Sequence, residues 1–534
     1  MTYADDVQTK KTPQNQPIRG KKQVQNRAGG YVFDVTDWQR LERFLILGHA
    51  GGTYYAAQRE LSLEVVDCLD RCAAEDIQRT VQTIIDISDA GRAPKNDPAI
   101  FALAYLSSKH DYSGEAMRGI PLVCRTTDHI TKFLNFSKTL GRGWGQRFKR
   151  GIQSWYDRFD SSLALARQVS KYPSRNGWSH ADILRKCHYK VSNEARNNVL
   201  KYVTQHQQWA ESDTVAYSDE LLAAVDICKT AGCPASLAIE LINEYGLCFE
   251  QLSTSLLNEP DVWDALLQPM QLTAMIRNLG KMSSIGILGP LSNNATLVMD
   301  RLTNPELLRD SRVHPMSLLI ALKTYSQGRG EKGSLTWTPN KNIVTALDYA
   351  FYLAFDNIVP TGKKFLLGVD ISPSMFSDYS RCVGTPQLFA GEAAAVMSLV
   401  AARTEKNAHI CGFADQFREL DISPLSTLED ACRASKSASF GGTDCAVPIQ
   451  YALNNNIPVD VFCLYTDNET WRGSEHVCQA LDRYRQKTGI AAKLAVFTLA
   501  ATNHSVADPT DSRQMNFVGM DTAAPALLAD FAKQ

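Results

Sequence analysis

Two aspartates and three hydroxyl side chains occupy positions from which they could act together. Asp370, Ser372 and Ser374 form the pattern D-x-S-x-S directly after the apolar run FLLGV. Thr443 lies in the glycine-rich stretch FGGTD, and Asp467 ends the run VFCLYTD. All five offer hard oxygen ligands, which suit octahedral Mg²⁺ or another divalent cation and suit zinc or copper poorly. The sequence therefore predicts a divalent cation site made of these five residues.

The elements that must position these residues lie in residues 363–534. Short apolar runs rich in β-forming residues, among them KKFLLGVDIS, AHICGFA, VDVFCLYTD and AKLAVFTLA, alternate there with helical stretches. This alternation predicts a parallel sheet with helices on both faces. Ligands of such sheets bind beyond the carboxyl ends of the strands, where Asp370 and Asp467 are expected. The five residues resemble the metal-ion-dependent adhesion site of Rossmann-like von Willebrand factor A domains.

The chemistry of such a site favours recruitment of a ligand over cleavage. Two-metal nucleases and phosphatases gather several carboxylates around ions about 4 Å apart, whereas here Asp370 and Asp467, with Asp444 nearby, supply the negative charge. An ion so held can accept an oxygen from a partner. A serine nucleophile would need an adjacent base, and a histidine could approach these serines only through the fold. We therefore expect no catalytic residues and no enzyme activity, with hydrolase chemistry as the alternative.

The preceding part of the chain has a different pattern. From residue 29 to residue 362, apolar residues recur at three- and four-residue spacing, as in WQRLERFLILG and HPMSLLIALKTYSQG, and several stretches end in glycine. Many short helices predict a solenoid of paired helices, although no fixed repeat period is present. Residues 1–28 are rich in Gln, Asn and Lys, which predicts a flexible polar arm.

The stretch from Lys138 to Lys190 is strongly basic. It holds twelve basic and three acidic residues in a chain whose net charge is −1. Cations contact phosphates and flat rings stack on unpaired bases, so this composition favours RNA binding, while a solvated helix face is the alternative. The interleaved aromatic residues are Trp144, Phe148, Trp155, Tyr156, Tyr172 and Trp178.

Composition excludes other classes. No run approaches the roughly 20 consecutive apolar residues that a membrane helix requires, and the N-terminus lacks the apolar core of a signal peptide. We therefore expect a soluble, cytoplasmic protein without membrane partners. Thirteen cysteines are spread from Cys68 to Cys478 without a CxxC pair, which predicts reduced and mostly buried thiols.

Long phrases throughout the chain resemble the Ro autoantigen family, in which a TROVE module precedes a von Willebrand factor A domain. The family implies a ring of irregular HEAT-like helical repeats, here residues 29–362, whose two ends are joined by the A domain, residues 363–534. The N-terminal phrase NRAGGYV is similar to bacterial members. The other matching phrases are AGGYVFDVTDWQRLERFLILGHAGGTYY, KYPSRNGWSH, LTAMIRNLGKM, PTGKKFLLGVDIS, GGTDC, DVFCLYTDNET and ADPTDSR.

The resemblance also implies partners. Y RNAs would bind the outer surface, where Lys171, Arg175 and His188 match family positions. Single-stranded 3′ ends of misfolded noncoding RNAs would enter a positive central hole. Noncoding RNA quality control follows, with an exonuclease such as polynucleotide phosphorylase tethered through a Y RNA in bacterial relatives. The protein itself is expected to be a monomer. Phosphate contacts on the surface and toward the hole would come from Lys138, Arg142, Arg147, Lys149 and Arg150.

Two features leave alternatives open. Asn468 follows Asp467 where many A domains have glycine, so the ligand set of the ion could differ from the family pattern. The chain could also be a metal-dependent protein-interaction scaffold without RNA specificity, whose helices only space the A domain. An RNA-processing enzyme is a further alternative, which the small number of carboxylates disfavours.

Overall fold

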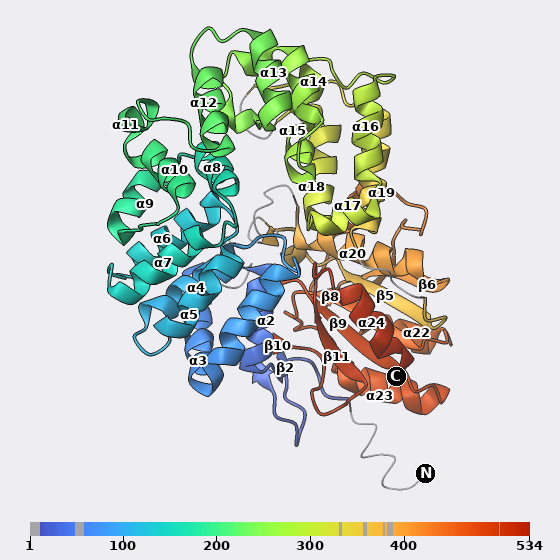
Figure 1. Cartoon of the computed structure of the whole chain (residues 1–534). Helices are drawn as coiled ribbons and strands as arrows, with labels where there is room; N and C mark the ends of the chain where they lie inside the picture. Colours follow the sequence, from blue (N-terminus) through green and yellow to red (C-terminus); the bar gives the residue numbers. More distant parts are fainter. Residues whose placement is uncertain are drawn as a thin grey trace.

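The structure is a computed structural model that describes residues 11–48, 58–330, 334–355, 360–377, 380–381, 388–500 and 502–534, with the backbone only for residues 58–63. Helices arranged in a ring and an α/β domain make up the molecule (Figure 1). The predicted fold class, a helical-repeat ring closed by an α/β A domain, is confirmed. No helix in these described ranges is long and apolar enough to cross a membrane.

The ring runs from α2, through α9 to α12, over α13 and α14, and back to α19 beside the α/β domain (Figure 1). Neighbouring helices pack as pairs, such as α4 with α6 and α18 with α19. The helices are α2 (Asp37–Leu47), α3 (Gln58–Asp89), α4 (Asp97–Ser108), α5 (Ser113–Val123), α6 (Thr127–Thr139), α7 (Gln146–Asp157), α8 (Ser162–Lys171), α9 (His180–Cys187), α10 (Glu194–Thr204), α11 (His206–Ala210), α12 (Tyr217–Lys229), α13 (Ala235–Tyr245), α14 (Pro260–Leu267), α15 (Leu272–Ser284), α16 (Asn293–Leu302), α17 (Pro305–Asp310), α18 (Pro315–Ser326) and α19 (Lys341–Leu353).

Short strands and polar caps shape the helical part. The hairpin of β3 (Ser174–Arg175) and β4 (Trp178–Ser179) interrupts the helices between α8 and α9. Ser179 then begins α9 with a capping box, in which its side chain accepts from the amide of Asp182. Such caps satisfy amides that a helix N-terminus leaves free.

The A domain is built on a six-stranded sheet of order β11-β9-β8-β5-β6-β7, parallel except for β7. Helices cover both faces. The strands are β5 (Lys364–Asp370), β6 (Asn407–Phe413), β7 (Phe417–Glu419), β8 (Val461–Thr466), β9 (Lys493–Thr498) and β11 (Gln514–Val518). The helices are α20 (Ala390–Thr404), α21 (Leu428–Ser437), α22 (Val447–Asn454), α23 (Val477–Thr488) and α24 (Ala524–Lys533).

Side chains that alternate along β5 enter two different cores. Phe365, Leu367 and Val369 join the core that holds α20, α21 and α24 and continues into the helical ring. Leu366 joins the smaller core that holds α22 and α23. Because successive strand residues point to opposite faces, one strand links the ring to the far side of the sheet. Described cysteines are free and, apart from Cys233 and Cys248, buried, as predicted.

The ring closes at the loop that precedes α4. His314 Nε2 hydrogen-bonds the carbonyl oxygen of Arg92 at 3.2 Å, which joins the start of α18 to the end of α3. The Arg92 guanidinium lies 2.5 Å from Glu42 of α2 and 2.6 Å from Asp521 of the A domain. Arg43, fully buried in α2, donates to the carbonyl oxygens of two A-domain residues, Thr502 and His504. Both ends of the helical array therefore contact each other and the A domain.

The predicted flexible arm is wrong for residues 11–28. The amide of Thr12 donates to Gln479 Oε1, and the amide of Ala28 donates to Glu469 Oε2. The strand β1 (Val24–Gln25) pairs with β2 (Tyr31–Asp34), and β2 in turn pairs with β10 (His504–Ser505) of the A domain. Polar composition did not prevent ordering because the hydrogen-bond partners come from the other end of the chain. Residues 1–10 of the predicted arm lie outside the described residues.

Replacing Asp521 by asparagine is expected to loosen this junction. Asp521 is 2% exposed and accepts from the Arg92 guanidinium, so the variant leaves Arg92 with Glu42 as its remaining carboxylate. We expect a loss of about 2 kcal/mol in the free energy of unfolding, measured by denaturant titration. Asp530→Asn, an exposed change on α24, is the control and should stay within about 0.5 kcal/mol. Equal stability of the two variants would contradict the role of Asp521.

Two buried histidines predict acid sensitivity. Burial lowers the pKa of His180 to about 4, and burial likewise lowers that of His314 to about 4 despite the nearby Asp521 carboxylate. The unfolded chain binds protons at these histidines below about pH 6.5 while the folded chain resists them. Stability should therefore be unaffected above pH 6.5 and fall by up to about 3 kcal/mol per histidine as the pH drops to 4. Denaturant midpoints across this range should fall less steeply for His314→Gln than for the unmodified protein, and parallel curves would contradict the prediction.

Candidate functional site

Asp370 and Thr466 end two neighbouring parallel strands, and this brings the first predicted ligand to the edge of the sheet. Asp370 is the last residue of β5, and Asp467 directly follows β8. Both carboxylates are buried. Asp370 Oδ2 accepts from Thr466 Oγ1 at 2.7 Å, which fixes the orientation of its side chain.

The two serines of the D-x-S-x-S pattern gather beside Asp370. Ser372 Oγ donates to Asp370 Oδ1 at 2.6 Å and lies 3.1 Å from Ser374 Oγ. Ser374 in turn hydrogen-bonds Asp467. Both serines are buried, at 1% and 4% exposure. Four of the five predicted ligands are therefore connected through their side-chain oxygens.

The fifth predicted ligand, Thr443, lies on the loop that covers the same edge. It is 1% exposed, and its carbonyl oxygen accepts from the amides of Trp471 and Arg472, shortly after Asp467. At the neighbouring Gly442 a Cβ would lie 2.7 Å from the Trp471 ring, so only glycine allows this approach. The glycine-rich loop and the segment after β8 thus hold each other in place.

Asn468 takes the place of the glycine found in many A domains for a backbone reason. Its φ is +65°, in the left-handed region that asparagine tolerates better than most residues. Its side chain donates to Thr498 Oγ1 and accepts from the amide of Val506. Both polar atoms of the Asn468 side chain are therefore bound to Thr498 and Val506 and not to the predicted ligands.

The electrostatics of this cluster are those of buried and uncompensated negative charge. Burial raises the pKa of Asp467 to about 8, with the neighbouring Asp370 adding to the shift. Burial raises the pKa of Asp444 to about 7 and raises that of Asp370 as well. In the described ranges, no lysine or arginine forms an ion pair with Asp370 or Asp467. The cluster therefore has the hard oxygens and the unbalanced charge that suit a divalent cation.

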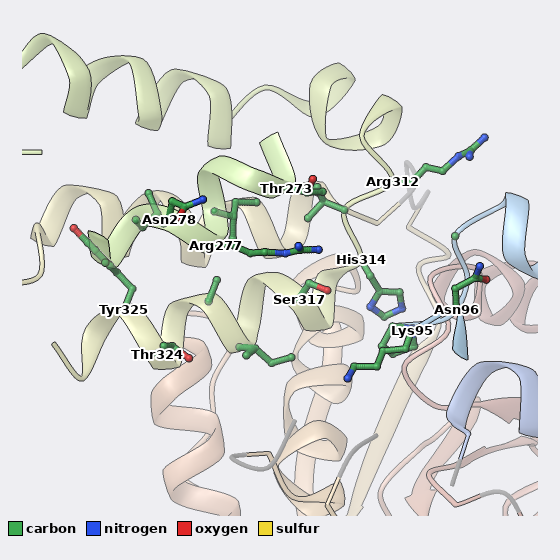
Figure 2. Close-up of a pocket in the computed structure, with 18 of the residues that line it drawn as sticks. Lys95, Asn96, Thr273, Arg277, Asn278, Arg312, His314, Ser317, Thr324 and Tyr325 are labelled. Atoms are coloured by element: carbon green, nitrogen blue, oxygen red, sulfur yellow. The ribbon is translucent and has the colours of Figure 1, made fainter. Parts of the chain in front are cut away.

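A large pocket lies where the two ends of the helical ring meet. Its volume is about 690 Å³, and we call it the junction pocket. Figure 2 shows Arg277 of α15 reaching toward Ser317 of α18, with Lys95 and Asn96 on the other side. The cations among its lining residues are Lys95, Arg125, Arg277, Lys281 and Arg312.

The junction pocket is basic because nothing in its described lining balances those cations. No described aspartate or glutamate lines it, although Arg312 pairs outside the lining with Asp89 at 2.9 Å. Burial and the nearby Arg312 charge lower the pKa of Arg125. The aromatic rings of Tyr325 and Trp337 complete the lining. Cations and flat rings in one hollow suit a single-stranded polyanion.

Sequence reasoning missed these cations because they come from four separate segments. Arg277 and Lys281 share α15, but the other cations, Lys95, Arg125 and Arg312, come from three further segments. The closed ring brings the four segments together. The phrase LTAMIRNLGKM, which contains Arg277 and Lys281, resembles a family phrase but has no other cation that would mark it as a basic segment. The sequence does not reveal that residues 89–92 contact residues 312–314, and this contact is what closes the ring.

The predicted Y RNA contacts come from three consecutive elements of the chain. Lys171 is the last residue of α8, Arg175 lies in β3, and His188 directly follows α9. Lys171 Nζ lies 3.5 Å from Glu250, and Arg175 Nε lies 3.4 Å from Asp128. His188 is exposed and ends α9 in the left-handed conformation, at φ +54°. Both cations therefore have a carboxylate neighbour, but the Arg175 side chain is 55% exposed and the Lys171 side chain 25%, so Arg175 and His188 are the more open to a ligand.

The other predicted RNA contacts lie at the end of α6, in the loop 141–145 and on α7. Lys138, Arg147 and Arg150 are exposed, and Arg142 and Lys149 are half-buried. None of these five lines the junction pocket. They form a second basic region, separate from the cations gathered there.

Half of the aromatic residues expected to stack on bases are core residues instead. Phe148, Trp155 and Tyr156 are at most 1% exposed, and Trp155 Nε1 donates to the Cys124 carbonyl oxygen. Their helical spacing reflects the buried face of α7. Trp144, Tyr172 and Trp178 remain partly exposed.

Comparison with known proteins identifies related chains. The family described as "TROVE domain" matches residues 24–223 and 246–324, and "Ro60 vWA domain" matches residues 364–532. The "RNA-binding protein RO60" of Deinococcus radiodurans is 40% identical over 519 residues, which are 96% of each chain. The protein of the same name from Caenorhabditis elegans is 31% identical, over 98% of this chain and 92% of that one. The crystal structure of Deinococcus radiodurans RO (RSR) protein aligns with a TM-score of 0.68 and 38% identity, over 93% of this chain and 99% of that one.

Proposed function

The chain belongs to the Ro60 family of TROVE-domain proteins, and from this premise we propose that it binds RNA and acts by binding rather than by catalysis. Single-stranded 3′ ends of misfolded or defective noncoding RNAs enter the ring, and Y RNAs bind its outer surface. The protein works in noncoding RNA quality control in the cytoplasm, as a monomer.

The observation that carries the proposal is the junction pocket. Five cations from separate segments converge there without a described carboxylate in the lining, at a cost in mutual repulsion that a bound polyanion would offset. The pocket also offers the partly exposed ring of Trp337 for contact with bases, whereas Tyr325 is 2% exposed and only supports the wall. A volume of about 690 Å³ accommodates a short single-stranded segment but not a duplex.

The exposed Arg175 and His188 support a second RNA surface on the outside of the ring. Duplex RNA is recognised mostly by its shape and through phosphates and 2′-hydroxyls across the shallow minor groove, which such side chains can contact. A Y RNA held there leaves the junction pocket free for a second RNA. It could tether an exonuclease such as polynucleotide phosphorylase, which would degrade RNAs that the ring has captured.

For the A domain, the proposal is that it binds a divalent cation, and the oxygen donors favour Mg²⁺. Asp370, Ser372, Ser374, Thr443 and Asp467 would hold it, and it would supply a positive charge that accepts a carboxylate or other oxygen of a protein partner. The residues themselves keep their oxygens in place through the bonds from Ser372 and Thr466 to Asp370.

Binding of one structured RNA in two forms tests the function. We expect the form with a single-stranded 3′ tail to bind at least tenfold more tightly than the blunt form, because an unpaired strand alone can enter the junction pocket. Filter binding at rising salt should give a steeper slope of log K against log[salt] for the tailed form, by about 0.7 per additional phosphate contact. Equal affinities and slopes would leave an ordinary basic surface, and absence of binding to both would favour the protein-interaction scaffold.

A further inference from the structure

A second cavity lies between α6, α7 and α9, away from the residues of the junction pocket. Its volume is about 410 Å³, and no described carboxylate lines it. We call it the tryptophan pocket, after Trp144 and Trp178 in its wall. The cations that line it are Lys138, Arg142 and Lys186.

The rings and cations of the tryptophan pocket are held in fixed relation. The Trp144 and Trp178 rings lie 6.0 Å apart with planes tilted by 51°. Lys186 Nζ lies 5.8 Å from the centre of the Trp144 ring. Trp178 is anchored by its Nε1, which donates to Asn135 Oδ1 at 2.8 Å. The half-buried rings therefore form a preorganised wall, and the cations stand beside it.

Unsatisfied polar atoms point to a ligand in this pocket. Ser137 is 1% exposed, and its Oγ has no hydrogen-bond partner among the described residues. The same is true of Arg142 Nε, although Arg142 Nη2 donates to Ser113 Oγ. Buried polar groups are otherwise almost always paired, and leaving one unpaired costs about 1–3 kcal/mol. A bound polar molecule would satisfy both.

The helix that borders the pocket favours an anion at the same place. The N-cap of α7 is Gly145, without a side-chain cap, and the first turn holds no acidic residue. It carries Arg147 instead, a charge that the helix dipole disfavours unless an anion lies nearby. The loop before it, residues 141–145, contains Gly141, Gly143 and Gly145, where a Cβ would meet nothing within 4 Å. Backbone at this edge is therefore open to a phosphate.

We propose that the tryptophan pocket binds one unpaired nucleobase of a folded RNA, with the base against Trp144 and its phosphate among Lys138, Arg142 and Lys186. The inference rests on the proposed RNA binding and deepens it. The pocket adjoins the outer RNA surface, because Arg175 of β3 is the strand partner of Trp178 of β4, which lines the pocket. A duplex on Arg175 and His188 would therefore present a bulged nucleotide to the pocket. A bulged base is already unpaired, so its insertion costs less than that of a paired base.

Two hairpins that differ by one nucleotide test the inference. One has a fully paired stem, and the other carries a single bulged uridine at mid-stem. We expect the unmodified protein to bind the bulged hairpin about tenfold more tightly, as stacking of one base on an aromatic ring provides. Trp144→Ala should remove that preference and leave affinity for the paired hairpin within about twofold. Trp144→Phe, which keeps a flat ring, should retain most of it.

Controls separate this inference from the proposed function. Trp38→Ala removes another half-buried tryptophan with a cation over its ring, here Arg79 at 3.8 Å. Trp38 lies on α2, so the preference for the bulge should survive. Should Trp144→Ala lower the unfolding midpoint, a 4-thiouridine at the bulge should photocrosslink to the peptide with Trp144 or Trp178. No preference for the bulge, or crosslinks elsewhere, would overturn the nucleobase site while RNA binding stands. If the unmodified protein bound neither hairpin, the proposed outer RNA surface would be overturned together with the nucleobase site.

Discussion

Replacing Arg277 and Lys281 by glutamate together is expected to weaken binding of a single-stranded RNA tail by about 100-fold. The two residues are one helical turn apart on α15, and both line the junction pocket. A charge-assisted hydrogen bond from one such cation contributes about 1.5–3 kcal/mol, and reversing its charge adds repulsion of the same phosphates. Arg277 is exposed, so the fold does not depend on it. Tailed and blunt RNAs measured side by side by filter binding give the result.

A matched double variant controls for net charge. Lys341→Glu with Lys487→Glu changes the charge by the same amount at exposed positions on α19 and α23, neither of which lines the junction pocket. It should weaken tailed RNA less than about threefold, through long-range electrostatics alone. In the pocket variant the slope of log K against log[salt] should also become shallower, by the amount that two phosphate contacts contribute. In the control variant the slope should not change. Similar losses in the two variants would show that overall charge, and not the junction pocket, holds the tail.

The A domain could be predicted from sequence because its strands are buried on both faces. Runs such as FLLGV and VFCLYT are continuous and apolar, and they became β5 and β8 with Asp370 and Asp467 at their carboxyl ends. The order of those residues along the chain was enough to predict that they meet, because parallel strands end at the same edge of a sheet. The oxygen cluster is therefore a local consequence of the strand pattern.

Other features required the tertiary structure. The basic stretch of residues 138–190 was visible as composition, but its aromatic residues divide between core and surface, as Phe148 and Trp144 illustrate. The arm of residues 11–28 was misjudged because its partners, such as Gln479 and Glu469, lie more than 400 residues away. The junction pocket is the extreme case, since a closed ring alone brings Lys95 beside Arg277. Composition therefore shows which residue types a segment contains, but contacts with distant segments determine which of them are buried, ordered or gathered in a pocket.

Replacing Asp370 and Ser372 by alanine together is expected to abolish Mg²⁺ binding. The pair supplies the buried carboxylate at the end of β5 and the hydroxyl that bonds it at 2.6 Å, so the double variant removes a formal charge and a neutral ligand at once. Isothermal titration with Mg²⁺, and with Mn²⁺ as a second probe, should give a measurable signal for the unmodified protein and none for the variant. Asp370→Asn, which keeps the side-chain shape beside Thr466, should bind at least tenfold more weakly because Mg²⁺ prefers carboxylate oxygen.

The chain contains its own control for this experiment. Asp421, Ile422 and Ser423 repeat the tripeptide of Asp370, Ile371 and Ser372, but Asp421 and Ser423 are exposed and outside the cluster. Asp421→Ala with Ser423→Ala should leave Mg²⁺ binding unchanged. RNA affinity should stay within about threefold in both double variants, because the cations of the junction pocket are carried by the helical ring and not by the sheet. If the Asp370 and Ser372 variant stayed folded by circular dichroism and lost RNA binding, the two sites would be coupled, and the division of labour between ring and A domain would be wrong.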